Sequence, residues 1–141
     1  YTPSKVLVWS TYVNSTKDLL KELGANAIGI TSNMNPVERQ DAIDAWRKGT
    51  AQALVLNPQS ASHGLTLNEA KTAVFYSNSF NLEHRLQALR RNYRIGQDAK
   101  TLVIDLIAPG TVETKIMLAL NKKEELANLV SSKQALLEIL Q

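Results

Sequence analysis

The chain has no cysteine and only two histidines, His63 and His84, among its 141 residues. The missing thiols exclude disulfides and thiolate metal sites, and so few histidines argue against a histidine-based metal site. No apolar run reaches the length that crosses a membrane, and no signal-peptide pattern is present, so we expect an intracellular, cytoplasmic setting and no membrane partner. Because the sequence begins at Tyr1 and not at methionine, we expect it to be a piece of a longer polypeptide.

A phosphate-binding loop is missing as well. The sequence contains no stretch of the form Gly-x-x-x-x-Gly-Lys-Ser/Thr and no acidic cluster at a strand end, so the chain cannot by itself hold a nucleoside triphosphate and magnesium in the usual way. A serine hydrolase is unsupported too, because Ser60 and Ser62 lack a glycine elbow and neither histidine has an evident acidic partner. We interpret His63, next to Gly64, as a turn residue.

The charge is small in total but concentrated in one place. Hydrophobic residues make up 44% of the chain and charged residues 21%, which is typical of a soluble globular domain, and the net charge is +3. The segment 83–100 holds five cations and two anions, so its own excess equals that of the whole chain. This distribution indicates one anion-facing patch and not a generally basic surface.

Short apolar runs alternate with helical patterns along the whole chain. The runs are continuously apolar, which is typical of parallel strands buried on both faces. The alternation predicts an α/β domain of three layers, in which helices flank a mainly parallel central sheet. We expect strands at 5–9, 27–30, 53–56, 73–76 and 101–107, and helices at 15–23, 36–48, 82–93 and 112–140, the last one with a break near 131–132.

Turn and cap residues mark the ends of these elements. Asn35, Pro36 and Glu38 have the spacing of an N-cap, first-turn proline and capping box, while Gly24 and Gly49 are natural helix stops. Ligands of parallel sheets gather at the carboxyl ends of the strands. The loops there are rich in hydroxyls and amides, which suits phosphate or sugar contacts, although ordinary polar turns would have the same composition; they are 10–12, 31–32, 57–64 and 77–81.

The segment 87–97 carries the strongest functional signal. At 100° per residue, Leu82, Leu86, Leu89 and Tyr93 share one stripe of the helix, while a glutamine and two arginines share roughly the opposite side. Arginine forks match phosphate oxygens in geometry and charge. A solvated basic helix face is the alternative that the spacing alone leaves open; the three polar residues are Gln87, Arg91 and Arg94.

This segment, together with the order of elements, resembles the C-terminal helicase-like lobe of Snf2-type superfamily 2 ATP-dependent DNA translocases. The sixth motif of that family runs Gln-Ala-x-x-Arg-x-x-Arg-Ile-Gly-Gln, and 87–97 matches it at all seven fixed positions. Segments 6–12, 30–46, 57–67 and 80–83 are similar to further motifs in the family order. The resemblance covers about residues 5–110, and the motif sequences are most similar to those of small bacterial or phage-encoded Snf2-like proteins.

The resemblance implies one RecA-like domain over 1–141, with 111–141 as a long C-terminal helix or helix pair. It implies that ATP and Mg²⁺ bind only together with a missing N-terminal RecA-like lobe of the same polypeptide, which carries the phosphate loop and the magnesium carboxylates. Arg94 would be the arginine finger, with Arg91 beside it and Gln87 ordering the site. Gly64 and Thr66 would approach the nucleotide.

Double-stranded DNA is the partner that the resemblance implies, and the activity is that of a DNA-stimulated ATPase, helicase or translocase. Ser10, Thr11, Asn57 and Ser60 would contact the nucleic-acid backbone, which positions the protein without reading sequence. A non-catalytic RecA-like module that binds nucleic acid or protein is the alternative. We also expect the apolar residues of the C-terminal helix to pack on the domain's own sheet, with packing on a neighbour as the alternative; they are Leu126, Leu129, Val130, Leu136, Leu137 and Leu140.

Overall fold

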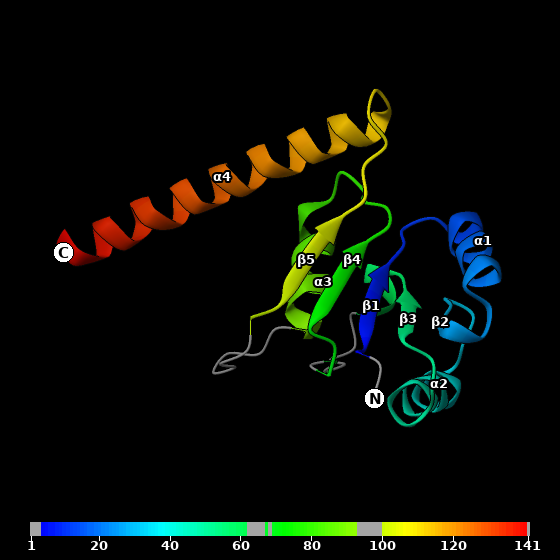
Figure 1. Ribbon diagram of the computed structural model, residues 1–141. Coiled ribbons are helices and arrows are strands. Elements are labelled where there is room, and N and C mark those ends of the chain that lie inside the picture. Colours follow the sequence, from blue (N-terminus) through cyan, green and yellow to red (C-terminus); the bar gives the residue numbers. More distant parts are fainter. Residues whose placement is uncertain (1–3, 62–66, 68, 93–99, 141) are drawn as a thin grey trace.

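The protein folds around one five-stranded parallel sheet, as the computed structural model shows for residues 4–61, 67, 69–92 and 100–140 (Figure 1). The strand order is β2-β3-β1-β4-β5, and every neighbouring pair is parallel and in register from its first residue. This confirms the predicted RecA-like α/β class. The strands are β1 (Val6–Trp9), β2 (Ala27–Ile30), β3 (Ala53–Leu56), β4 (Thr72–Phe75) and β5 (Leu102–Asp105).

Helices connect these strands and lie on both faces of the sheet. Two short 3₁₀ segments also occur between the strands, η1 (Gly24–Asn26) before β2 and η2 (Pro58–Ala61) after β3. The helix from 82 and the helix from 36 begin where the sequence predicts. The helices are α1 (Val13–Leu23), α2 (Pro36–Lys48), α3 (Leu82–Asn92) and α4 (Val112–Leu140).

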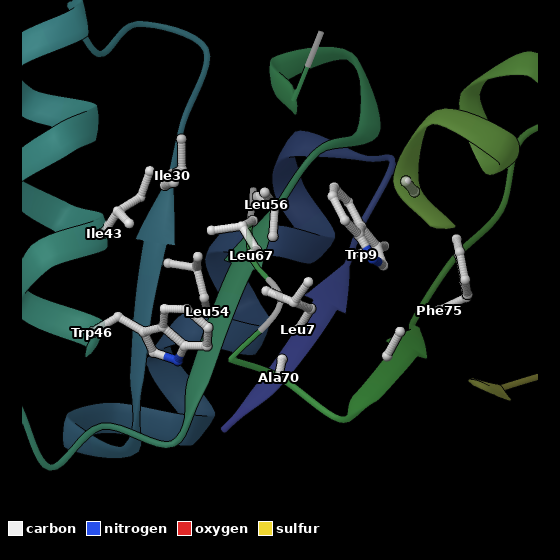
Figure 2. Packing of buried hydrophobic residues seen from close by; sticks show 12 residues of the cluster. Leu7, Trp9, Ile30, Ile43, Trp46, Leu54, Leu56, Leu67, Ala70 and Phe75 are labelled. Carbon is white, nitrogen blue, oxygen red and sulfur yellow. The ribbon is translucent and has the colours of Figure 1, made fainter. Parts of the chain in front are cut away.

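The main core lies between the sheet and the pair α2 and α3. Alternate residues of the strands point to this face, because side chains alternate along a strand. Trp46 of α2 and Trp9 of β1 are both fully buried there, and Phe75 of β4 faces α3 (Figure 2). The buried cluster consists of Leu7, Trp9, Ile30, Ile43, Trp46, Leu54, Leu56, Leu67, Ala70, Ala73, Phe75 and Ala88.

Helix α1 covers the opposite face. Gly29 precedes the core residue Ile30 in β2, so its hydrogen points away from the main core and toward α1. A Cβ atom added at Gly29 would lie 2.5 Å from a methyl carbon of Leu20. Glycine therefore leaves room for the Leu20 side chain of α1, which would have to shift if position 29 carried a Cβ.

One strand departs from the prediction of burial on both faces. β5 forms an edge of the sheet, and Leu102, Ile104 and Leu106, which alternate onto the α1 side, are 58%, 38% and 46% exposed. Helix α1 contacts β2 and β3, at the other side of the sheet. The apolar run 101–107 thus predicted the strand correctly, but the predicted burial of its side chains was wrong.

Helix α4 also corrects two predictions. It runs unbroken through Ser131 and Ser132, and its distal half extends away from the sheet instead of packing on it (Figure 1). Its base is anchored by buried Ile116 and Leu120, whereas Leu126 and other distal apolar residues are exposed. At 100° per residue, Leu126 lies about 120° around the helix from Leu120, so one straight helix cannot present both to the same surface. None of the helices among the described residues, α4 included, is long and apolar enough to cross a membrane.

The ends of α2 are held by side chains, as predicted for its start. Asn35 Oδ1 accepts a hydrogen bond from Glu38 N at 2.8 Å, and Glu38 Oε2 accepts one from Asn35 N at 2.9 Å, which completes the capping box. The other end has a cap that the sequence did not reveal. The Lys5 ammonium donates to the carbonyl oxygens of Trp46, Gly49 and Ala51 at 2.5, 3.0 and 2.8 Å.

We expect Lys5→Met to lower the free energy of unfolding by about 1–3 kcal/mol, because it leaves the three carbonyls that Lys5 joins without their charged donor. Lys48→Met is the matched control, since it removes the same charge from the exposed last turn of α2 and should change stability by at most about 0.5 kcal/mol. Urea unfolding followed by tryptophan fluorescence measures both. Equal effects of the two substitutions would contradict the proposed cap.

Candidate functional site

The carboxyl ends of β1, β3 and β4 form one polar edge of the sheet, where the sequence predicts the ligand contacts. Ser10, directly after β1, is fully buried. Its hydroxyl lies 2.8 Å from the Thr16 hydroxyl, which is also 2.9 Å from the carbonyl oxygen of Tyr12. Ser10 therefore links β1 to the first turn of α1 and does not reach the surface in this arrangement.

The neighbouring residues tie the strand ends together. Thr11 N donates to Ser77 Oγ at 2.8 Å, and Asn57 Nδ2 donates to the carbonyl oxygen of Thr11 at 3.0 Å. Asn57 Oδ1 accepts from Gln59 N at 2.8 Å. Thr11 and Asn57 are half-buried, whereas Ser60 is buried. The predicted contact residues are thus brought to one edge, and two of the four keep a partly exposed surface.

Two of the hollows that the described residues form at this edge differ in charge. One, of about 380 Å³, lies between the start of α1 and the ends of β2 and β3, and Lys17 is its charged residue. It is lined by Val13, Thr16, Lys17, Ile30, Thr31, Ser32, Asn33 and Asn57. The other, of about 570 Å³, carries the carboxylates of Asp105 and Glu113 beside Tyr12 and Tyr76. Only the first combines a cation with hydroxyls and amides.

Helix α3 begins at the same edge. Asn81 Oδ1 accepts from Glu83 N at 3.0 Å and from His84 N at 3.4 Å, so it caps the first turn. Ala88 is fully buried against the sheet side, and Leu89 packs on the core cluster. The buried face is therefore centred between these two residues and not on the predicted stripe of leucines.

Gln87 and Arg91 lie on the other side of α3, at 140° and 180° from Leu82 if each residue turns the helix by 100°. Both are half-buried, whereas the sequence predicts that they point outward. Arg91 Nε is buried and has no hydrogen-bond partner among the described residues. The backbone of Arg91 is held in place, because its carbonyl oxygen accepts from Leu67 N at 2.8 Å.

Three of the predicted site residues lie outside the described residues. These are Arg94, Gly64 and Thr66. Their roles remain predictions from the sequence. Gln87 and Arg91, which the structure does describe, lie on the helix that leads directly to Arg94.

An ion pair beneath α3 is not among the contacts that the sequence predicts. Arg85 Nη1 and Nη2 donate to Asp105 Oδ1 and Oδ2 at 2.7 and 2.9 Å, a two-pronged contact between α3 and β5. The two side chains are only 14% and 21% exposed. A signal was present, since 85 lies between 88 and 89 on the helix circumference and therefore faces the sheet.

The described part of the chain contains no group of three or more histidine, cysteine, aspartate or glutamate side chains that could hold a metal ion. The acidic residues that line the 570 Å³ hollow, Asp105 at the end of β5 and Glu113 in the first turn of α4, have other partners. Asp105 binds Arg85, and Glu113 Oε2 accepts from Ala108 N at 2.6 Å. The site offers cations and neutral donors, which suits the binding of an anion.

Comparison with known proteins identifies this arrangement. Residues 1–96 match the family described as the helicase conserved C-terminal domain. The chain belongs to that family. The matched part includes the polar strand edge and α3, so the candidate site is part of the family's conserved domain and not of the C-terminal extension.

Curated relatives are consistent with the predicted Snf2-type lobe. The chain is 31% identical over 103 residues to the chromodomain-helicase-DNA-binding protein 3 homolog of Caenorhabditis elegans, with 72% of this chain and 6% of the relative covered. It is 30% identical over 96 residues to the chromatin-remodeling ATPase INO80 of Schizosaccharomyces pombe, covering 67% and 6%. Over 135 residues it is 30% identical to the DNA repair protein rhp54 of the same yeast, covering 92% and 16%.

A solved structure shares the fold. The C-terminal part of the Fun30 ATPase domain superposes with a TM-score of 0.74 at 24% identity, covering 83% of this chain and 39% of that one. This chain spans only 6% to 16% of the length of the three curated relatives named above. The predicted closeness to bacterial or phage proteins stays a prediction, since these relatives come from a nematode and a yeast.

Proposed function

We propose that this helicase C-terminal domain is the second motor lobe of a DNA-dependent ATPase and translocase, and that it supplies arginines to an ATP site shared with an N-terminal RecA-like lobe. The observation that carries the proposal is Arg91. Its guanidinium is buried at Nε without a hydrogen-bond partner among the described residues, on the side of α3 that also carries Gln87. Arg94 follows three residues later in the sequence. A partly buried guanidinium whose Nε has no partner within the described residues is suited to a phosphate that another lobe brings.

The chemistry that these residues would perform is electrostatic. Charge that develops on the transferred phosphoryl oxygens is stabilised by guanidinium groups placed beforehand, and an arginine supplied across an interface contributes about 10³–10⁵ in rate. Arg94 would serve as the finger, Arg91 would bind an adjacent phosphate oxygen, and Gln87 would orient the site through its amide. Gly64 and Thr66 would line the nucleotide.

ATP and magnesium belong to the shared site. The described residues lack an acidic cluster for the ion, so this lobe fits the phosphate and not the metal. The magnesium ligands would therefore come from the N-terminal lobe and the nucleotide, and the residues of this chain need only to position positive charge. This division of the ATP site between two lobes would explain why the chain carries the arginines of the site but no phosphate loop.

Duplex DNA would lie along the polar strand edge. The 380 Å³ hollow joins Lys17 to the hydroxyls and amides of Thr31, Ser32 and Asn57 at the start of α1, which are groups that bind phosphate oxygens without reading bases. Thr11 and Asn57 would contact the backbone directly. Ser10 and Ser60, which are buried, would act there by holding the strand ends. Closing and opening of the two lobes would then step the protein along DNA.

We expect the full-length protein that contains this chain to show DNA-stimulated ATP hydrolysis, and Arg94→Ala to lower turnover by about 10³-fold or more. Arg91→Ala should also lower it, while nucleotide binding stays largely intact because the phosphate loop is on the other lobe. Arg90→Ala is the matched control on the same helix, since Arg90 is exposed and 3.8 Å from Glu83. Steady-state hydrolysis and nucleotide-binding titrations measure both properties.

Unchanged turnover in Arg94→Ala would contradict the arginine-finger role. A full-length protein that binds DNA in a salt-dependent manner but hydrolyses no ATP would instead support the alternative, a non-catalytic RecA-like module. The two outcomes are distinguished by the wild-type protein alone.

We expect Lys17→Ala to weaken DNA binding several-fold irrespective of sequence and to reduce the slope of log affinity against log salt by about 1. The reason is the loss of one phosphate contact at the 380 Å³ hollow. Lys48→Ala removes the same charge from the end of α2, at the opposite edge of the sheet, and should leave affinity and slope unchanged. Fluorescence anisotropy with a labelled duplex over a salt series measures this; equal effects of both changes would indicate a merely diffuse attraction.

A further inference from the structure

The side of α3 that packs on the sheet is held by a polar contact at its centre. If each residue turns the helix by 100°, Arg85 lies between Ala88 and Leu89 on the circumference and so points at the sheet. Ala88 is fully buried and Leu89 is partly buried against the core. A charged side chain in this position is retained only when its charge is met inside the fold.

Three residues on the sheet side contact the Arg85 guanidinium. Both terminal nitrogens of Arg85 donate to Asp105 of β5, and Nη1 also lies 3.1 Å from Asn78 Oδ1 after β4. The guanidinium carbon stands 4.4 Å from the ring centroid of Phe75 in β4, in the range of a cation–π contact. Asn78 donates in turn to Asp105 Oδ1 at 3.3 Å, so the contact is a closed network.

This network can define the rotation of α3 on the sheet better than the apolar contacts do. Apolar packing is not directional, and Ala88 offers only a methyl group against the sheet, so it resists rotation of α3 weakly. A two-pronged arginine–carboxylate contact has a defined geometry. Together with the hydrogen bond from Leu67 N to the Arg91 carbonyl oxygen, it therefore limits how far α3 can rotate about its axis or shift along it.

Gln87 and Arg91 lie about 160° and 120° around α3 from Arg85 if each residue turns the helix by 100°. Side chains of a helix reach about 5–6 Å from its axis, so a rotation of about 10° moves their ends by about 1 Å. A misplacement of that size near reacting groups lowers rates by about 10²-fold. The position of the Arg91 side chain thus depends on a contact made on another side of the same helix.

We propose that Arg85 and Asp105 are positioning residues, whose two-pronged contact sets the rotation of α3 and thereby places Arg91 for phosphoryl transfer. The proposal rests on the function proposed above. It assigns a catalytic effect to a pair that touches neither nucleotide nor DNA, and it distinguishes this pair from the exposed pair Arg90–Glu83 on the same helix, whose side chains are 67% and 58% exposed at 3.8 Å.

The test uses the full-length protein. Arg85→Lys keeps the charge and removes the fork, and Asp105→Asn keeps the shape and removes the charge. Each should lower kcat by about 10- to 100-fold with KM for ATP changed less than about threefold, because the binding groups of the phosphate loop are untouched. Arg90→Lys is the matched control and should retain kcat within about twofold.

A double-mutant cycle separates positioning from general destabilisation. In single-turnover measurements, Arg85→Lys should change the rate less than about threefold in an Arg91→Ala background, because the group that it positions is gone. The same fold-loss in both backgrounds, or wild-type kcat in both Arg85→Lys and Asp105→Asn, would overturn the proposal. A wild-type protein without ATPase would overturn the proposed function and this inference with it, whereas failure of the variants alone overturns only the inference.

Discussion

The arrangement of this domain depends on how α3 is seated on the parallel sheet. All five strands run the same way, so their carboxyl ends bring β1, β3 and β4 to one polar edge and start α3 there. The helix turns one side to the core and the other to the candidate phosphate. Because apolar packing alone leaves rotation weakly defined, the polar contacts of α3 set where the second side points: the ion pair of Arg85 with Asp105 and the bond from Leu67 N to the Arg91 carbonyl oxygen.

The sequence predicted the fold well because the signals for it are local. Each strand is a short β-branched run, and α2 carries its N-cap, first-turn proline and capping box within four residues, all of which the structure confirms. The start of α4 at Val112 and its extent are also as expected. The predicted burial of β5 and of the distal half of α4 was wrong. Both segments have apolar sequences but exposed side chains, because an apolar sequence does not specify which part of the fold covers it.

The candidate site was predictable in location but less so in detail. The strand-end loops and the helix at 82–92 were found from composition and spacing. The buried state of Ser10 was not, because its hydroxyl meets Thr16 only after α1 folds back. The pairing of Arg85 with Asp105 joins residues 20 positions apart; helical spacing indicates which way Arg85 faces but does not reveal its partner. The chemistry of long-range polar pairs appears only once the topology is known.

The central claim is that this lobe supplies guanidinium groups to a phosphate held by another lobe. The most direct measurement is a structure of the full-length protein on duplex DNA with ADP and aluminium fluoride, which mimics the transferred phosphoryl group. The account predicts that nitrogens of Arg91 or Arg94 lie about 2.7–3.2 Å from the fluoride ligands. A closed complex in which both arginines face solvent or DNA, away from the nucleotide, would contradict it.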